Sequence, residues 1–422
     1  MARKRGEEPD LGTFVGAGGF GVDSRRAVKV LRARQLGQAS EAAPLLWVRV
    51  AVLSGASRAV LHWEPGRFEA RFDGAPLPPL ILARPYDAHL GAMDGTPLMR
   101  QFGLALLHLA RPDVAVEVVS GPADARRAIY LEGPGAAPPA ATEDGLDETV
   151  VRAYWSPAAQ VPRGHPEGWD LGALLGRLDS APMPVTVIHR GKVSVVVPWA
   201  KRFGREGWVG EVGGLRCGLR LLPRDWEASV LQLCVDGVGV AAESPRGAPL
   251  AAEGWVDSPH LTLNASLDRV VQGSARDHAR SALQDALQAA LLAGLERHAR
   301  RMTLTGAALR RDPALARFWG AAAEEGTQVC ASVRERLEAA SGRFRGPSGD
   351  RVLVEDTAVW TAAWRAAAKK REGKPTPAEF RPVYRALAAT PLFFDSDARP
   401  VLLRDKHRAS ALSRADAAYL GL

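Results

Sequence analysis

Few residues of this sequence have the types and spacing that a catalytic or ligand-binding site requires. The stretch Gly16-Ala-Gly-Gly-Phe-Gly21 matches the G-x-G-x-x-G pattern of nucleotide-binding loops. Such a site needs a buried strand before the glycines and an acid about 20 residues later. The preceding LGTFV is a poor strand, and Glu41 lies in a polar stretch. We therefore favour a flexible loop over a phosphate cradle at residues 16–21.

Other catalytic patterns are missing from the sequence. The 9 histidines include no H-E-x-x-H pair, and no G-x-S-x-G nucleophile elbow occurs. The only cysteines are Cys217, Cys234 and Cys330, an odd and sparse set that argues against a disulfide framework or a zinc site. We expect no metal. The start MARKRGEEPDLG has no apolar run behind it, so we expect a cytoplasmic protein without a signal peptide or membrane span.

The elements that would position a site are clearest in the first third of the chain. An apolar stretch with one charge, Arg49, predicts a buried helix over 44–54 that ends at Gly55. Pro65-Gly66 separates two strands, and Thr96-Pro97 opens a further helix. The remaining predicted elements here are strands 58–64, 67–73, 114–120 and 127–132 and helix 96–110. This order of elements predicts an α+β layer sandwich.

The rest of the chain divides at a Pro/Ala-rich segment, residues 133–145. Beyond it, strands are predicted at 185–189, 192–198, 215–222 and 229–235, followed by a long helix over 275–301. From residue 304 the pattern is nearly all helical. We therefore expect domains at 1–133, 149–302 and 303–422, with a linker at 134–148.

The middle of the chain resembles the middle domain of heat shock protein 90. The matching residues are Gly254-Trp-Val-Asp-Ser258 and Leu261-Thr-Leu-Asn-Ala-Ser266, which precede a long helix as in that family. In the family an arginine that reaches the γ-phosphate follows this motif, whereas the chain has Leu267.

The N-terminal segment resembles the ATPase domain of the same superfamily, the GHKL group of gyrase, histidine kinases, chaperones and MutL-type proteins. The family's Gly-Ala falls on Gly55-Ala56, which puts Leu46 where the family has a general-base Glu and Val50 where it has a Mg²⁺-binding Asn. Asp73-Gly74 stands where the adenine-binding acidic loop begins, with Pro76 in place of its second glycine.

The resemblance thus implies a shrunken GHKL-type sandwich without hydrolysis. A leucine cannot deprotonate water, a valine cannot ligate Mg²⁺, and without the arginine the transition-state charge is not neutralised. We expect a catalytically inactive, chaperone-like binding or assembly protein with no cofactor; Asp73 and Gly74 are the residual candidates for ATP contact. The alternatives are a divergent active ATPase and a nucleic-acid-associated relative of the gyrase and MutL branch.

The candidate partner surface lies in the C-terminal region. The net charge is +8, and arginine outnumbers lysine with abundant Ala, Gly and Pro, as in proteins from GC-rich bacterial genomes. Trp360 and Trp364 are one helical turn apart, ahead of the basic Lys369, Lys370 and Arg371. We favour the interpretation that the tryptophans pack in a core; the alternative is that they form a protein-binding hot spot. Nucleic-acid contact by the basic cluster is the less favoured reading.

Overall fold

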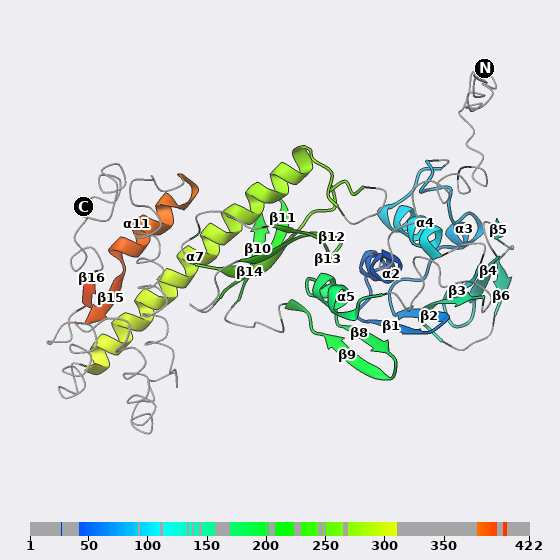
Figure 1. Ribbon diagram of the computed structural model, residues 1–422, viewed down its shortest axis with the longest axis horizontal. Helices are drawn as coiled ribbons and strands as arrows, with labels where there is room; N and C mark the ends of the chain where they lie inside the picture. The colour runs from blue at the N-terminus through cyan, green and yellow to red at the C-terminus, as the bar shows by residue number, and fades with distance from the viewer. Residues whose placement is uncertain are drawn as a thin grey trace, which may run out of the picture. The chain divides into compact units, whose positions relative to one another are not determined.

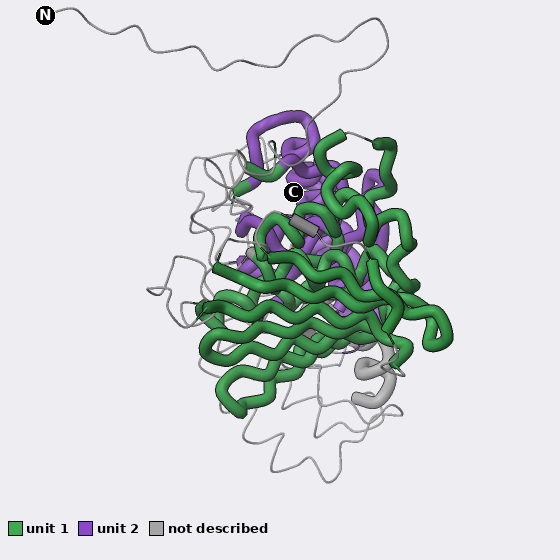
Figure 2. The backbone as a smooth tube through the Cα atoms, turned by 90° about the vertical axis from the view of Figure 1, so that its right-hand side faces the viewer, with its two compact units in different colours: residues 1–197, 236–238, 263–269 green, residues 198–235, 239–262, 270–422 purple. Residues whose placement is uncertain are grey.

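The structure is a computed structural model of the 422-residue chain. It divides into two compact units: residues 1–197, 236–238 and 263–269, and residues 198–235, 239–262 and 270–422 (Figure 2). The residues that it describes are 27, 42–91, 93–109, 113–132, 135–136, 139–142, 146–156, 169–199, 201, 207–222, 229–243, 248, 250–264, 269–309, 378–394 and 400–402.

The first unit is built on a nine-stranded sheet. Its strands run in the order β5-β4-β3-β7-β2-β1-β8-β9, with β6 also paired to β4. Neighbouring strands are antiparallel, except that β1 and β8 are parallel. The strands are β1 (Ala59–Glu64), β2 (Arg67–Phe72), β3 (Val114–Ser120), β4 (Arg127–Glu132), β5 (Gly135–Ala136), β6 (Ala140–Ala141), β7 (Thr149–Trp155), β8 (Val185–His189) and β9 (Lys192–Val196).

Helices cover one face of this sheet (Figure 1). They are α2 (Ala42–Leu53), α3 (Pro79–Ala83), α4 (Pro97–Leu109) and α5 (Leu171–Leu178). Strand β2 shows how the two faces differ, because successive side chains point to opposite sides. Phe68 and Phe72 are buried in the core on the helix side, whereas Arg67 and Arg71 lie on the other face.

The second unit has a five-stranded sheet in the order β10-β11-β14-β12-β13. The 36-residue helix α7 (Ser274–Leu309) packs on it through apolar residues such as Leu283, Leu287 and Leu291. No helix of the described ranges is long and apolar enough to cross a membrane. The strands and the smaller elements are β10 (Gly207–Val212), β11 (Leu215–Leu221), β12 (Val230–Val235), β13 (Val238–Glu243), β14 (Ala252–Asp257), the 3-10 helix η2 (Ala378–Phe380), α11 (Arg381–Ala389), β15 (Pro391–Phe394) and β16 (Pro400–Leu402).

The mixed α+β class is confirmed, and the helices and hairpins predicted from residues 44–132 lie within one or two residues of the observed ones. The predicted region limits do not coincide with breaks in the sheet. β7, which starts at the predicted boundary, lies between β3 and β2, and β8 and β9 extend the same sheet. Residues 134–148, predicted as a linker, contribute β5 and β6. In the region predicted as nearly all helical, the described residues include the β15–β16 pair. Pairing between distant segments explains the places of β7 and β8, because such pairing leaves no local pattern. β5, β6, β15 and β16 pair with strands close in sequence, and their shortness hid them in a Pro/Ala-rich stretch and a helix-like stretch.

Candidate functional site

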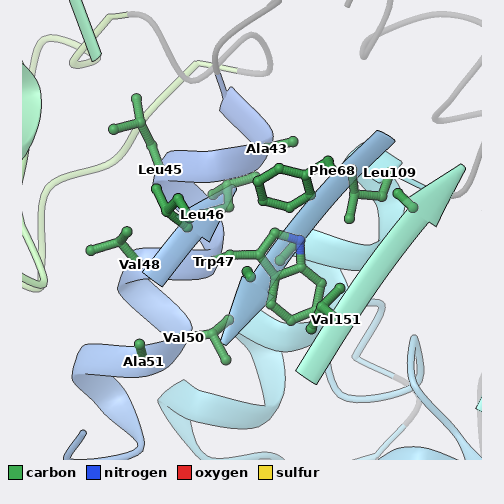
Figure 3. Close-up of a cluster of buried hydrophobic side chains, with 14 of the residues drawn as sticks. Ala43, Leu45, Leu46, Trp47, Val48, Val50, Ala51, Phe68, Leu109 and Val151 are labelled. Carbon is green, nitrogen blue, oxygen red and sulfur yellow. The ribbon is translucent and has the colours of Figure 1, made fainter. Parts of the chain in front are cut away.

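The candidate site comprises helix α2 and the segment that follows it. The resemblance to the GHKL group puts Leu46 and Val50 of this helix at the positions of the general base and the Mg²⁺ ligand. Gly55, with φ +74°, ends the helix, and the amide of Ala56 donates to the carbonyl of Ala51. This left-handed residue is a common helix stop that favours glycine. Leu46 is 2% exposed and Val50 is 0% exposed, and both belong to the core of the first unit (Figure 3). The burial predicted for the helix over 44–54 is thus confirmed at both positions.

Apolar and aromatic packing surrounds this helix. The Trp47 ring meets Phe102 of α4 edge-on, with centroids 5.8 Å apart. The buried Gln101 of α4 donates from Nε2 to the carbonyl of Leu46 at 3.4 Å. The side chains at positions 46 and 50 therefore offer neither a base nor an oxygen ligand. Nor does the described part of the chain contain a group of three or more His, Cys, Asp or Glu residues that could hold a metal ion.

Asp73, directly after β2, is bound to the segment between α2 and β1. Its carboxylate accepts hydrogen bonds from the Ser57 amide (2.8 Å), the Ser57 hydroxyl (2.6 Å) and the Arg58 amide (3.0 Å). Burial acts to raise the pKa of Asp73, but these hydrogen bonds outweigh it and lower the pKa below its ordinary value. Asp73 therefore joins two chain segments and has fewer lone pairs left for a ligand.

Gly74 allows the chain to pass close to the end of α2. A Cβ atom on Gly74 would lie 1.9 Å from Oγ of Ser54, so no other residue fits without movement. Nearby, the Leu77 amide donates to Oγ of Ser120, which lies 2.8 Å from Oγ1 of Thr149. Both hydroxyl residues are buried. The polar groups around the acidic loop thus bond mainly to one another.

Sequence reasoning missed Ser54, Ser57, Ser120 and Thr149 as parts of this network. Their partners lie 16 to 43 positions away, apart from local bonds such as that from Ser54 Oγ to the Ala51 carbonyl. No local pattern pairs Ser57 with Asp73, because the two residues lie 16 positions apart.

The motif that resembles heat shock protein 90 forms β14 and the turn after it. Trp255 is 6% exposed, and the Ser258 amide donates to the carbonyl of Cys234 at 2.9 Å. The Asn264 side chain accepts from the Arg269 amide at 3.1 Å. The motif is therefore a structural one among the described residues. Position 267, where the family has its arginine, lies outside them.

Other candidates from the sequence lie outside the described residues as well. They are the glycine-rich stretch 16–21 and the partner-binding candidates Trp360, Trp364, Lys369, Lys370 and Arg371. Each of these stays a prediction.

A polar cluster that sequence reasoning did not find lies on the sheet face away from the helices. Glu69 is only 4% exposed, and its carboxylate pairs with Arg67 (2.9 Å), Arg71 (2.5 Å) and Arg152 (3.2 Å). Burial acts to raise the pKa of Glu69, but the arginines, Arg71 first, outweigh it and lower the pKa. Arg152 also pairs with Glu117 at 2.7 Å, so the charges continue across three strands.

Two tyrosines flank this cluster and reach solvent. Tyr130 of β4 is 50% exposed and Tyr154 of β7 is 42% exposed. Tyr130 lies directly opposite Glu117, whose hydrogen bond raises the tyrosine pKa. The guanidinium of Arg67 lies 5.8 Å from the centre of the Tyr154 ring. We call this set of arginines, glutamates and tyrosines the open sheet face.

Comparison with known proteins gives only distant similarity. No family model matches the chain, and no curated protein matches it. Among solved structures, the B-subunit of the DNA gyrase from Myxococcus xanthus is similar over 61% of this chain and 93% of its own, with 14% identity and a TM-score of 0.44. The 43K ATPase domain of Thermus thermophilus gyrase B, in complex with an aminocoumarin, is similar over 82% and 96%, with 12% identity and a TM-score of 0.45. Similarity at this level does not establish a family or a function.

Proposed function

We propose that this protein is a catalytically inactive, GHKL-like binding or assembly protein, chaperone-like in the manner of heat shock protein 90. The observation that carries the proposal is the burial of Leu46 and Val50, which are 2% and 0% exposed. At these positions the resemblance to the GHKL group would put the general base and the Mg²⁺ ligand. Apolar side chains packed into a core supply neither function.

The chemistry of hydrolysis requires groups that these positions lack. A general base must lie within hydrogen-bond reach of the attacking water, and Mg²⁺ requires oxygen ligands. Asp73 keeps its carboxylate, but three donors from Ser57 and Arg58 already bind it. The sequence also has Leu267 where a charge-neutralising arginine is expected. These features together favour a protein that works by binding.

The open sheet face supports a binding role. Tyrosine and arginine are enriched at the energetic centres of protein interfaces, and here Tyr130 and Tyr154 stand exposed beside Arg67 and Arg152. The charges nearby are paired with one another, so the face is not strongly basic. This composition fits a protein partner better than nucleic acid, whose binding depends on unpaired cations.

Steady-state ATP hydrolysis by the full-length chain tests the proposal. We expect the rate to equal that of the Leu46→Ala variant, because neither protein has a base at position 46. Capture of partners from the native host should then recover a protein whose retention falls in a Tyr130→Ala, Tyr154→Ala double variant. Turnover that disappears on Asp73→Ala would contradict the proposal and indicate a divergent active ATPase.

A further inference from the structure

Strand β9 ends the large sheet, and its far side has no partner strand among the described residues. It forms a hairpin with β8 through a two-residue turn, Arg190 and Gly191, whose φ angles are +50° and +72°. Two positive φ angles are typical of a type I′ turn, which sets the register tightly. The hairpin stands at the border of the sheet (Figure 1).

The side chains of this border are unusually apolar. Val193, Val195 and Val197 are 64%, 58% and 40% exposed, and they alternate along the chain on one face. Val196, between them, is 6% exposed and belongs to the core. Edge strands of soluble proteins usually carry charges, prolines or bulges that prevent pairing. Here Val193 and Val195 lie within β9, and Val197 directly follows its last residue.

The turn also determines which backbone groups face outward. In a two-residue hairpin the residues flanking the turn, here His189 and Lys192, form the hydrogen-bonded pair, and such pairs alternate with non-bonded ones. Val193 and Val195, opposite Ile188 and Thr186, are therefore non-bonded positions toward β8. This alternation directs their N–H and C=O groups to the free side of β9. The exposed valines and the outward backbone groups thus belong to the same residues.

We propose that β9 pairs with β9 of a second copy of this chain, antiparallel and across a two-fold axis at Val195. In this register Val195 lies opposite Val195 of the second copy, and Val193 lies opposite Val197. The outward N–H and C=O groups then face each other as hydrogen-bonded pairs, and every exposed valine meets a valine. An antiparallel pair of identical strands is the arrangement in which an edge complements itself.

Charge and size are compatible with this pairing. Lys192 falls opposite Pro198 of the second copy, so no two like charges are opposed within the strand pair. The pairing covers only a few residues, because β9 ends at Val196 and Pro198 follows two residues later. So short a contact buries less than the roughly 800 Å² per partner of a standard interface, so we expect a dissociation constant on the order of micromolar. The inference goes beyond the proposed function and does not depend on whether ATP is hydrolysed.

Sedimentation equilibrium of the full-length chain from about 1 to 100 µM, around the expected dissociation constant, measures this association. Val195→Lys would place two lysines opposite each other on the axis, so we expect the dissociation constant to rise at least about tenfold. The control is Val230→Lys, a valine 47% exposed on β12, which has partner strands on both sides. A monomer at every concentration, or equal weakening by both variants, would overturn the proposal.

Cysteine cross-linking tests the register itself. Paired residues at hydrogen-bonded positions have Cα atoms about 5.5 Å apart, within the range that a disulfide spans. Under copper-phenanthroline oxidation, Val195→Cys should therefore give a covalent dimer, and so should the double variant Val193→Cys, Val197→Cys. Val193→Cys alone should stay at the wild-type background, because its counterpart is four residues away along the partner strand. Equal yields from Val193→Cys and Val195→Cys would contradict this register.

Discussion

Replacing Leu46 by alanine and by glutamate distinguishes a filled core from an open nucleotide pocket. Leu46 is 2% exposed and belongs to the buried cluster around α2 (Figure 3). Truncating a buried leucine costs about 2–5 kcal/mol, because the transfer free energy is lost and a cavity is left. We therefore expect Leu46→Ala to lower the free energy of unfolding by about 3 kcal/mol, independently of pH.

Leu46→Glu adds the cost of burying a carboxyl group. Burial favours the neutral acid and can raise the pKa of a buried glutamate from about 4.3 to 7 or higher. Each pKa unit corresponds to 1.36 kcal/mol, so the added cost reaches about 3–4 kcal/mol at pH 7. With the folded-state pKa above the unfolded one, this cost is absent below about pH 4 and grows as pH rises toward the folded pKa.

Urea unfolding of the full-length chain at pH 4 and pH 7, followed by tryptophan fluorescence, measures both terms. Trp47, next to position 46, is 0% exposed and reports on this layer. The control is Leu80→Ala in α3, where the leucine is 52% exposed and a change within about 0.5 kcal/mol is expected. If Leu46→Glu unfolds within about 1 kcal/mol of the wild type at pH 7, position 46 faces water, and the filled-core account fails.

Three further predictions concern charged groups of the first unit. Because the pKa of Asp73 is lowered from 3.8, its carboxylate stabilises the folded state fully above pH 3.8, and this stabilisation is lost as pH falls further. Asp73→Asn should therefore remove the decrease in the urea midpoint that the wild type shows below pH 3.8. Burial, and secondarily the charge of His89, lowers the pKa of His108 from 6.5 to about 4, so this histidine should destabilise the fold by up to about 3 kcal/mol as pH drops from 6.5 to 4. His108→Leu should remove this contribution and leave only the smaller fall that comes from His89, whose pKa burial also lowers. Glu69→Gln should lower the free energy of unfolding by about 1–3 kcal/mol, because three arginines lose their shared counter-charge. The control is Glu64→Gln, whose side chain is half-exposed and whose loss should be less than about 0.5 kcal/mol. Equal losses of stability in the two variants would contradict the role given to Glu69.

Local patterns predicted the local elements. The Pro65-Gly66 turn and the alternation around it gave the β1–β2 hairpin, and Thr96-Pro97 gave the start of α4. The apolar run at residues 44–54 predicted a buried helix, and with it the burial of Leu46 and Val50. These features depend on residues a few positions apart, which is the range over which sequence periodicity is informative.

The features missed depend on distant residues. β7 pairs with β3 and β2, and β8 pairs in parallel with β1 more than 120 positions earlier, so the extent of the first unit was not visible in the sequence. Asp73 was identified as a candidate, but its bonds to Ser57 and Arg58 span 16 and 15 positions. The ion pair of Glu69 with Arg152 spans 83 positions and follows only from the strand register.

Titration of the full-length chain with ATP and Mg²⁺ in a calorimeter tests the central claim most directly, because it detects binding without relying on turnover that contaminating ATPases could supply. With Leu46 and Val50 in the core and Asp73 bound by Ser57 and Arg58, we expect no saturable heat up to about 1 mM nucleotide, which corresponds to less than about 4 kcal/mol of binding free energy. A 1:1 binding curve that disappears in the Asp73→Ala variant would contradict the account and restore the acidic loop as a nucleotide site.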